Sequence, residues 1–334
     1  MVYLAHFNEQ YYLDSYPDVN ASVNTGGNFF SGFEHFIFYG LDEGRSLVSP
    51  YFSEQGYLAL YPDVANAVAA GFFSSGVEHF ALRGADEGRY SPIATFDSEQ
   101  AYLQKYPDVA LAVNQGFFRS GYDHFLQTGQ FEGRVPSYFN ERDYLVLNPD
   151  VAAAVGVADP QTGLVAFNSG FEHYLLFGQF ENRLSLFSGT RGNDVITSFG
   201  ESLTALTGVE YAVLARDPFN YALGSTGVGE IDILIGGAQQ NDFLLGLSRS
   251  PSNPNPRQLY VGGGNADYAL IRGFERGFDA IQLVGTINDY TQQAIGANLA
   301  ISTNTGDLVA IVEGVNTPLA PVTATAPGGA FLIA

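Results

Sequence analysis

Residues 53–89 read SEQGYLALYPDVANAVAAGFFSSGVEHFALRGADEGR, and the motifs of this segment recur along the chain, which indicates a repeat fold. The first motif is Tyr-Pro-Asp-Val at 16–19, 61–64 and 106–109, and Asn-Pro-Asp-Val at 148–151. The second is His-Phe or His-Tyr at 35–36, 79–80, 124–125 and 173–174. The third is Glu-Gly-Arg or Glu-Asn-Arg at 43–45, 87–89, 132–134 and 181–183. Four units of roughly 42 to 49 residues therefore fill positions 7 to about 185, a length typical of helical solenoid repeats.

Each unit predicts three short helices. A capping residue opens the first helix, which ends before a proline that starts the second helix. The third helix opens with a Ser-x-x-Glu or Ser-x-x-Asp capping box and ends at a glycine. The expected caps are Asn8, Ser53, Ser98 and Asn140 for the first helix and Ser31, Ser75, Ser120 and Ser169 for the third. We expect Gly26, Gly71 and Gly116 to end the second helix, and the fourth unit carries an insertion at Val157–Leu164.

The closing turn of each unit predicts a fixed backbone shape. Three units have glycine at positions 44, 88 and 133, and the fourth has Asn182. Asparagine is the commonest other residue at positive φ, so we expect a left-handed backbone there. The arginine that follows should pair with a nearby acid, such as the Asp of the Pro-Asp-Val turn.

One histidine and one aromatic pair also recur in the repeats. The single histidine per unit (His35, His79, His124 and His173) favours a hydrogen-bonded structural role over a metal site, because metal sites need several converging ligands. The aromatic pairs Phe29/Phe30, Phe72/Phe73 and Phe117/Phe118 leave two interpretations open. They are exposed interface anchors, or one ring is core and the other packs on the next repeat.

After about Leu186 the helical periodicity disappears and an all-β domain is expected. Apolar β-forming runs alternate with turn signals such as Gly236-Gly237. The clearest runs are 231–235, 243–245, 268–271, 280–284, 298–301 and 308–312. The predicted fold is two-part, α plus β: a helical repeat domain over 1–186 and a β-roll or sandwich over 187–334.

Three segments in this half carry a Gly/Asn/Asp signature, at 189–196, 236–244 and 262–268. They resemble the nonapeptide of RTX, or hemolysin-type calcium-binding, proteins. That resemblance implies a parallel β-roll with Ca²⁺ between successive turns. Carried over by position, the candidate calcium ligands are Asp194, Asp242 and Asp267. The copies here are single, degenerate and far apart, so the alternative is a roll or sandwich that has lost most calcium sites.

The helical repeat is also similar to units of large secreted bacterial proteins, especially cyanobacterial ones. The two resemblances imply an extracellular protein. The start of the chain has no Sec signal pattern, whereas RTX-type proteins use type I secretion with an uncleaved C-terminal signal, for which Ala326–Ala334 is compatible.

Composition narrows the classes of partner. The 334 residues contain 35 acidic and 14 basic side chains, and the formal net charge is −21. This charge argues against nucleic acid and anionic membranes. No apolar run is long enough to insert into a bilayer. The chain has no cysteine but has 27 Phe and 20 Tyr, a surface composition suited to packing against copies of itself.

No catalytic pattern is recognisable, so we expect a protein that is not an enzyme. The favoured function is a self-assembling extracellular structural protein, a subunit of a surface layer, sheath or filament, with calcium as a candidate stabilising ion. The alternative is a calcium-dependent adhesin or glycan-binding protein that attaches to cell-surface polysaccharide. A structural subunit should polymerise, whereas an adhesin should remain monomeric.

Overall fold

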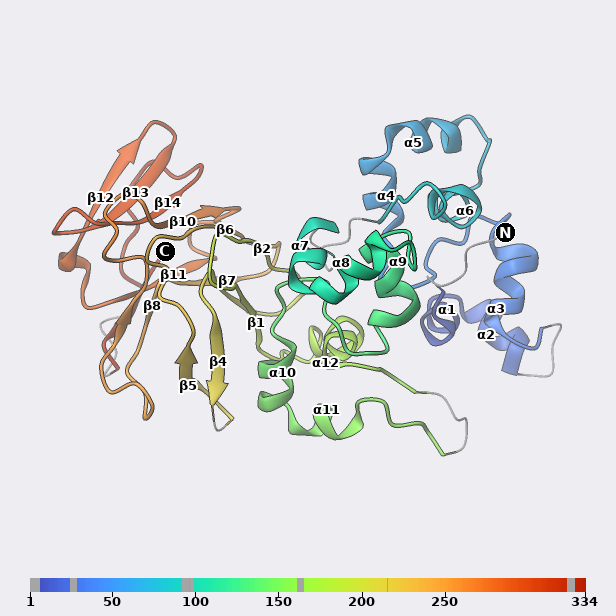
Figure 1. Cartoon of the computed structure of the whole chain (residues 1–334), viewed down its shortest axis with the longest axis horizontal. Coiled ribbons are helices and arrows are strands. Elements are labelled where there is room, and N and C mark those ends of the chain that lie inside the picture. The colour runs from blue at the N-terminus through green and yellow to red at the C-terminus, as the bar shows by residue number, and fades with distance from the viewer. Residues whose placement is uncertain are drawn as a thin grey trace. The chain divides into compact units, whose positions relative to one another are not determined.

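The computed structural model confirms an N-terminal helical repeat array followed by a β-solenoid of about three turns (Figure 1). The structure describes residues 7–24, 29–91, 96, 99–160, 165–214, 216–322 and 328–334. Gly26, Ser98, residues 161–164 of the insertion and Ala326–Pro327 lie outside these residues. The chain forms two compact units, Met1–Ser137 with Gly156–Glu172 and Tyr138–Val155 with His173–Ala334. The fourth repeat contributes to both units.

Each repeat has the three predicted helices. The first helices are α1 (Glu9–Ser15), α4 (Glu54–Leu60), α7 (Glu99–Lys105) and α10 (Glu141–Leu147). The second are α2 (Pro17–Asn24), α5 (Pro62–Ala69), α8 (Pro107–Asn114) and α11 (Pro149–Ala154). The third are α3 (Gly32–His35), α6 (Gly76–His79), α9 (Gly121–His124) and α12 (Gly170–His173), which lead into the π-helical turns Phe36–Gly40, Phe80–Gly84, Phe125–Gly129 and Tyr174–Gly178.

Side-chain caps start these helices where the sequence predicts. The Ser53 hydroxyl accepts from the Gly56 amide at 3.0 Å, and the Ser75 hydroxyl accepts from the Glu78 amide at 3.0 Å. Glu54 has a further role, because its carboxylate accepts from the backbone amides of Gly76 and Val77. The first helix of the repeat therefore satisfies free N–H groups at the start of the third helix. Glu9 and Glu99 make the equivalent bonds.

The closing turn has the predicted left-handed backbone. Gly44, Gly88 and Gly133 have φ of 69°, 69° and 70°, and Asn182 has φ of 55°. Each turn directs an arginine to the Asp of the same repeat's Pro-Asp-Val motif, which confirms the expected pairing. The pairs are bidentate, with the shorter bond at 2.7 Å in Arg45–Asp18, Arg89–Asp63, Arg134–Asp108 and Arg183–Asp150.

The solenoid stacks two strands per turn. β2 (Val195–Thr197), β6 (Ile231–Ile235) and β10 (Tyr268–Arg272) pair in parallel on one face. β1 (Ser185–Ser188), β3 (Thr204–Thr207), β7 (Asn241–Leu244) and β11 (Ala280–Val284) pair in parallel on the other (Figure 1). The second face carries an inward apolar row of Phe187, Leu206, Phe243 and Ile281, all fully buried.

Antiparallel strands follow the parallel turns. β12 (Tyr290–Ile295), β13 (Asn298–Thr303) and β14 (Leu308–Val312) extend the first face beyond β10, and β15 (Ala330–Ile333) pairs with β11. Two short hairpins lie outside the faces, β4 (Tyr211–Leu214) with β5 (Asp217–Leu223) and β8 (Gly246–Leu247) with β9 (Arg257–Gln258). In the described part of the chain, no helix has the length and apolar character to cross a membrane.

The fourth repeat is joined to the first solenoid turn by backbone pairing. The Asn140 amide donates to Leu186 at 2.8 Å, and the Ser188 amide donates to Tyr138 at 3.1 Å. Asp143 of α10, fully buried, accepts from the backbone amide of Val213 in β4 at 2.9 Å. These bonds bring the start of the repeat into the solenoid unit and orient the β4–β5 hairpin.

Candidate functional site

The recurring histidines are structural, as the sequence predicts. Each Nδ1 is hydrogen-bonded to a buried tyrosine hydroxyl of the first helix of its repeat. The pairs are Tyr12–His35 at 3.0 Å, Tyr57–His79 at 3.0 Å, Tyr102–His124 at 3.1 Å and Tyr144–His173 at 2.9 Å. The histidines are 5–6 % exposed, and burial lowers the pKa of each imidazole.

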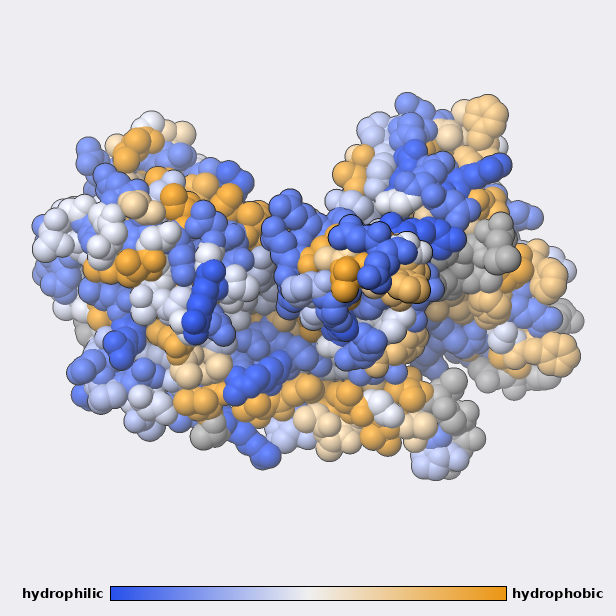
Figure 2. All heavy atoms as spheres, in the orientation of Figure 1, coloured by the Kyte–Doolittle hydropathy of each residue, from blue (hydrophilic) through white to orange (hydrophobic). Residues whose placement is uncertain are grey.

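In each aromatic pair, one ring packs against the protein and the other is exposed. Phe29, Phe73 and Phe118 pack edge-on against the histidine of their own repeat, with centroids 4.7–4.9 Å apart. The other member of each pair is exposed: Phe30 is 95 %, Phe72 77 % and Phe117 74 % accessible. Figure 2 shows apolar side chains projecting where the loop after α5 turns toward α6. An exposed ring therefore occurs at the helix-joining turn of three repeats, directly before the packed ring in Phe72 and Phe117 and directly after it in Phe30.

Asp194 belongs to the first Gly/Asn/Asp segment (189–196) and lies directly before β2. Its carboxylate accepts hydrogen bonds from the Thr190 amide at 2.6 Å and the Tyr138 hydroxyl at 2.8 Å. Its own amide donates to Asp232 Oδ1, 38 residues further along the chain, at 2.8 Å. Asp194 and Asp232 therefore occupy corresponding positions on successive turns.

Asp232 is an acidic residue of these turns that sequence reasoning missed. It is fully buried, and the Tyr260 hydroxyl donates to its Oδ2 at 2.6 Å. Burial, together with the nearby charges of Asp194 and Glu230, raises the pKa of Asp232 to about 7. The signal was present in Gly227-Val-Gly-Glu-Ile-Asp232, where a glycine-rich turn precedes the carboxylate.

Asp267 belongs to the third segment (262–268) and lies directly before β10. Its Oδ2 accepts from the Gly229 amide at 3.1 Å, and its Oδ1 is buried with no hydrogen-bond partner. The turn beside it is crowded, because a Cβ on Gly263 would lie 2.6 Å from a carboxylate oxygen of Asp267. An unpartnered buried carboxylate oxygen is costly, and a bound cation would offset that cost.

Asp242 lies elsewhere. Asn241, not Asp242, points into the turns, where its backbone amide donates to Asp279 Oδ1 at 2.8 Å. Asp242 is the next residue of β7 and faces outward, between Ala205 of β3 and Ala280 of β11. The structure therefore separates Asp242 from the turns that hold Asp194 and Asp267. Among the described residues, no group of three or more His, Asp or Glu side chains converges to hold a metal ion.

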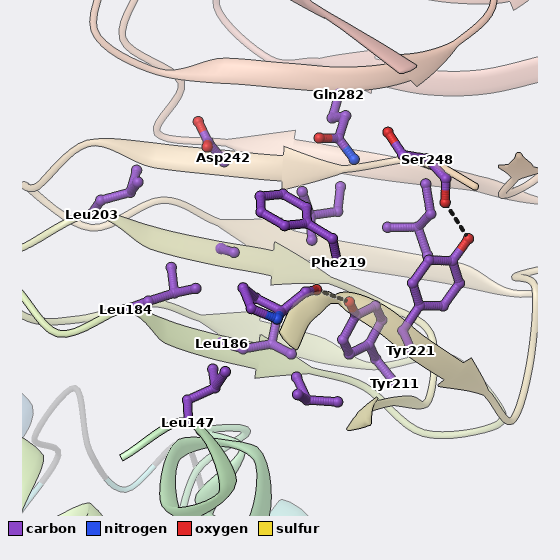
Figure 3. Close-up of a pocket in the computed structure, with 15 residues that line it drawn as sticks. Leu147, Leu184, Leu186, Leu203, Tyr211, Phe219, Tyr221, Asp242, Ser248 and Gln282 are labelled. Atoms are coloured by element: carbon purple, nitrogen blue, oxygen red, sulfur yellow. Dashed lines mark hydrogen bonds between the residues drawn. The ribbon is translucent and has the colours of Figure 1, made fainter. Parts of the chain in front are cut away.

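Asp242 lines an apolar pocket on the outer face of the solenoid, under the β4–β5 hairpin (Figure 3). The cavity has a volume of about 230 Å³. Figure 3 shows the ring of Phe219 over the middle strands, with Asp242 and Gln282 on one side of it and Leu186 and Tyr211 on the other. This pocket could not be predicted from the sequence, because the hairpin, the strands and α10 come from distant segments.

No family model matches the chain, and no curated protein matches it. The functional conclusions below therefore depend on the surface, the turns and the pocket of this molecule.

Proposed function

We propose that this protein is an extracellular structural subunit that assembles with copies of itself into a layer, sheath or filament. The observation that carries the proposal is the exposure of Phe30, Phe72 and Phe117 at the helix-joining turns of three successive repeats. Aromatic side chains are the commonest anchors of protein interfaces, and exposing them has no benefit for a dispersed monomer.

A second copy of the chain is the occupant that this surface suits. Because an exposed ring occurs at this turn in three repeats, a matching surface on another copy can engage several rings at once. Once one such contact holds two copies together, further contacts of the same kind strengthen the association. A contact between different surfaces of two copies, repeated without closure, produces a fibre or sheet.

The net charge of −21 sets a condition on assembly. Copies with this charge repel one another, and salt screens the repulsion over about 8–10 Å at physiological ionic strength. We therefore propose that assembly requires salt or divalent cations. The composition also supports an extracellular location, because a chain without cysteine folds independently of the redox state outside the cell. Export by type I secretion belongs to the same proposal.

Calcium is the divalent ion that we propose. Asp267 fits a calcium ligand, since its Oδ1 has no donor and a glycine-rich turn with backbone carbonyls lies beside it. Bound calcium would neutralise the buried charge of this carboxylate. The fit is poorer at Asp194, where Thr190 and Tyr138 already donate to both oxygens. Asp267 and the turn at 262–264 are therefore the place to test calcium binding.

The assembly surface is tested by the triple variant Phe30→Ser/Phe72→Ser/Phe117→Ser. Removing anchors of this kind commonly costs at least about 2 kcal/mol, so we expect the concentration needed for assembly to rise at least about tenfold. Sedimentation velocity over a concentration series measures this shift. The matched control is Val228→Ser/Phe278→Ser/Ile295→Ser, which removes exposed apolar side chains of the solenoid unit and should assemble as the wild type does. Equal assembly of the wild type and the phenylalanine variant would reject the proposed surface.

A further inference from the structure

The pocket under the β4–β5 hairpin is apolar on nearly every side. Its floor is the outward face of β1, β3 and β7, and its cover comes from the hairpin. Leucine, valine and proline side chains and aromatic rings form most of the lining (Figure 3). The polar tips of two lining tyrosines are already used, since Tyr211 donates to Pro218 at 2.8 Å and Tyr221 donates to Ser248 at 2.8 Å. These two tyrosines therefore present rings, not free hydroxyls, to the cavity.

Asp242 is the one charged side chain among the lining residues. Its Oδ1 is buried and has no hydrogen-bond partner. The residues beside it on the neighbouring strands are Ala205 and Ala280, which leave space above the carboxylate and supply no donor. Such an arrangement is unfavourable in the free protein and becomes favourable when a donor or cation enters.

We propose that this pocket binds a small amphiphilic amine, with its ammonium group on Asp242 and its apolar body among the leucine and aromatic side chains. An ammonium group supplies both the hydrogen-bond donors and the charge that Asp242 lacks. The protein's net charge of −21 also favours a cationic ligand over an anionic one. This site is separate from the exposed phenylalanines and from the turns for which we propose calcium.

The size of the cavity limits the ligand. A cavity of 150 Å³ holds one benzene molecule, so 230 Å³ accommodates about nine or ten non-hydrogen atoms. An unbranched amine of about eight carbons or an arylalkyl amine has this size. Phe219 is largely exposed and lies over the pocket, so it would cover the apolar body of the ligand.

The charge state of Asp242 agrees with this ligand. Burial, with the neighbouring Asp279 as the second cause, raises the pKa of Asp242 above its ordinary value. The free pocket therefore disfavours the carboxylate, and a bound ammonium would restore it.

Isothermal titration calorimetry with three probes of equal length tests the proposal: octylamine, 1-octanol and octanoate, each below its aggregation concentration. We expect one octylamine per chain, weaker binding of octanol and the weakest binding of octanoate. The variant Asp242→Asn should lose octylamine affinity at least about tenfold, because it removes a charge-assisted hydrogen bond. Glu201→Gln, an exposed acid outside the pocket, is the matched control and should bind as the wild type does.

A second variant separates loss of binding from loss of structure. Phe219→Ala should weaken all three probes together, whereas Phe278→Ala, an exposed ring outside the pocket, should weaken none. The midpoint temperature of unfolding of Asp242→Asn should equal or exceed that of the wild type, because the variant removes a carboxylate with a buried, unpartnered oxygen. The proposal is overturned if octylamine does not bind, if octanol binds as tightly, or if folded Asp242→Asn retains full affinity.

Discussion

Replacing Gly84 by alanine is expected to destabilise the helical unit by about 2 to 5 kcal/mol. Gly84 ends the π-helical turn of the second repeat, and a Cβ there would overlap the hydroxyl of Tyr57. That hydroxyl is hydrogen-bonded to His79 Nδ1 at 3.0 Å, and both residues are buried. The variant would therefore overpack the site and break a buried hydrogen bond, and these costs add to each other.

A double-mutant cycle distinguishes this cause from a general loss of helix stability. Tyr57→Phe alone should cost about 1 to 3 kcal/mol, because it leaves a buried imidazole nitrogen unpartnered. In the double variant Tyr57→Phe/Gly84→Ala, the new methyl group occupies space that the hydroxyl has left. We expect the double variant to be about as stable as Tyr57→Phe, as measured by urea unfolding followed by circular dichroism. If the two costs simply add, the destabilisation caused by Gly84→Ala does not come from the clash with the Tyr57 hydroxyl.

The second large effect is a loss of solenoid stability as the pH rises from about 4 to about 7. The pKa of Asp232 is raised to about 7 in the folded protein, whereas an unfolded aspartic acid titrates near 4. The folded state therefore binds this proton more tightly than the unfolded state does. The contribution of the protonated Asp232 to the free energy of unfolding is fully present below pH 4 and is lost as the pH rises through 7. The difference corresponds to about 4 kcal/mol. Asp232→Asn should flatten the dependence, while Glu201→Gln should leave it unchanged.

The helical unit should respond to pH in the opposite direction. Burial lowers the pKa of its histidines, so the unfolded chain binds protons more readily below about pH 6.5. Stability of the helical unit is then present above pH 6.5 and is lost on acidification. Hydrogen exchange at pH 5 and pH 7, read separately for the peptides of each unit, checks both directions. A solenoid that is equally protected at the two pH values would contradict the account of Asp232.

The sequence allowed the helical repeats to be predicted in detail because their signals are local. Caps, prolines and the closing turn each depend on neighbouring residues, and Asn182 identified the left-handed position by replacing a glycine. The strands predicted at 231–235, 268–271 and 280–284 are also confirmed, because apolar β-forming residues mark them, and the second strand extends one residue further, to Arg272. The pairing of each arginine with its aspartate could be predicted because both residues recur in every repeat, although they lie 26 or 27 residues apart in the first three repeats and 33 apart in the fourth.

Other features depend on contacts between distant segments and could not be predicted. The tyrosine that bonds each histidine lies 22 to 29 residues away in the chain. The side chain of Asp242 projects outward because Asn241, the first residue of β7, occupies the position that contacts Asp279 of the next turn. The pocket is formed by a hairpin of weak sequence pattern that folds over strands from other turns.

Negative-stain electron microscopy of the purified protein shows whether it assembles with copies of itself. The protein should be imaged at physiological salt with calcium and again after chelation. We predict regular filaments or sheets with calcium, and their dissolution on chelation would identify calcium as the stabilising ion. If the assemblies survive chelation, the proposed structural role stands and calcium is not required for assembly. Dispersed monomers in both conditions would contradict self-assembly and favour a monomeric adhesin.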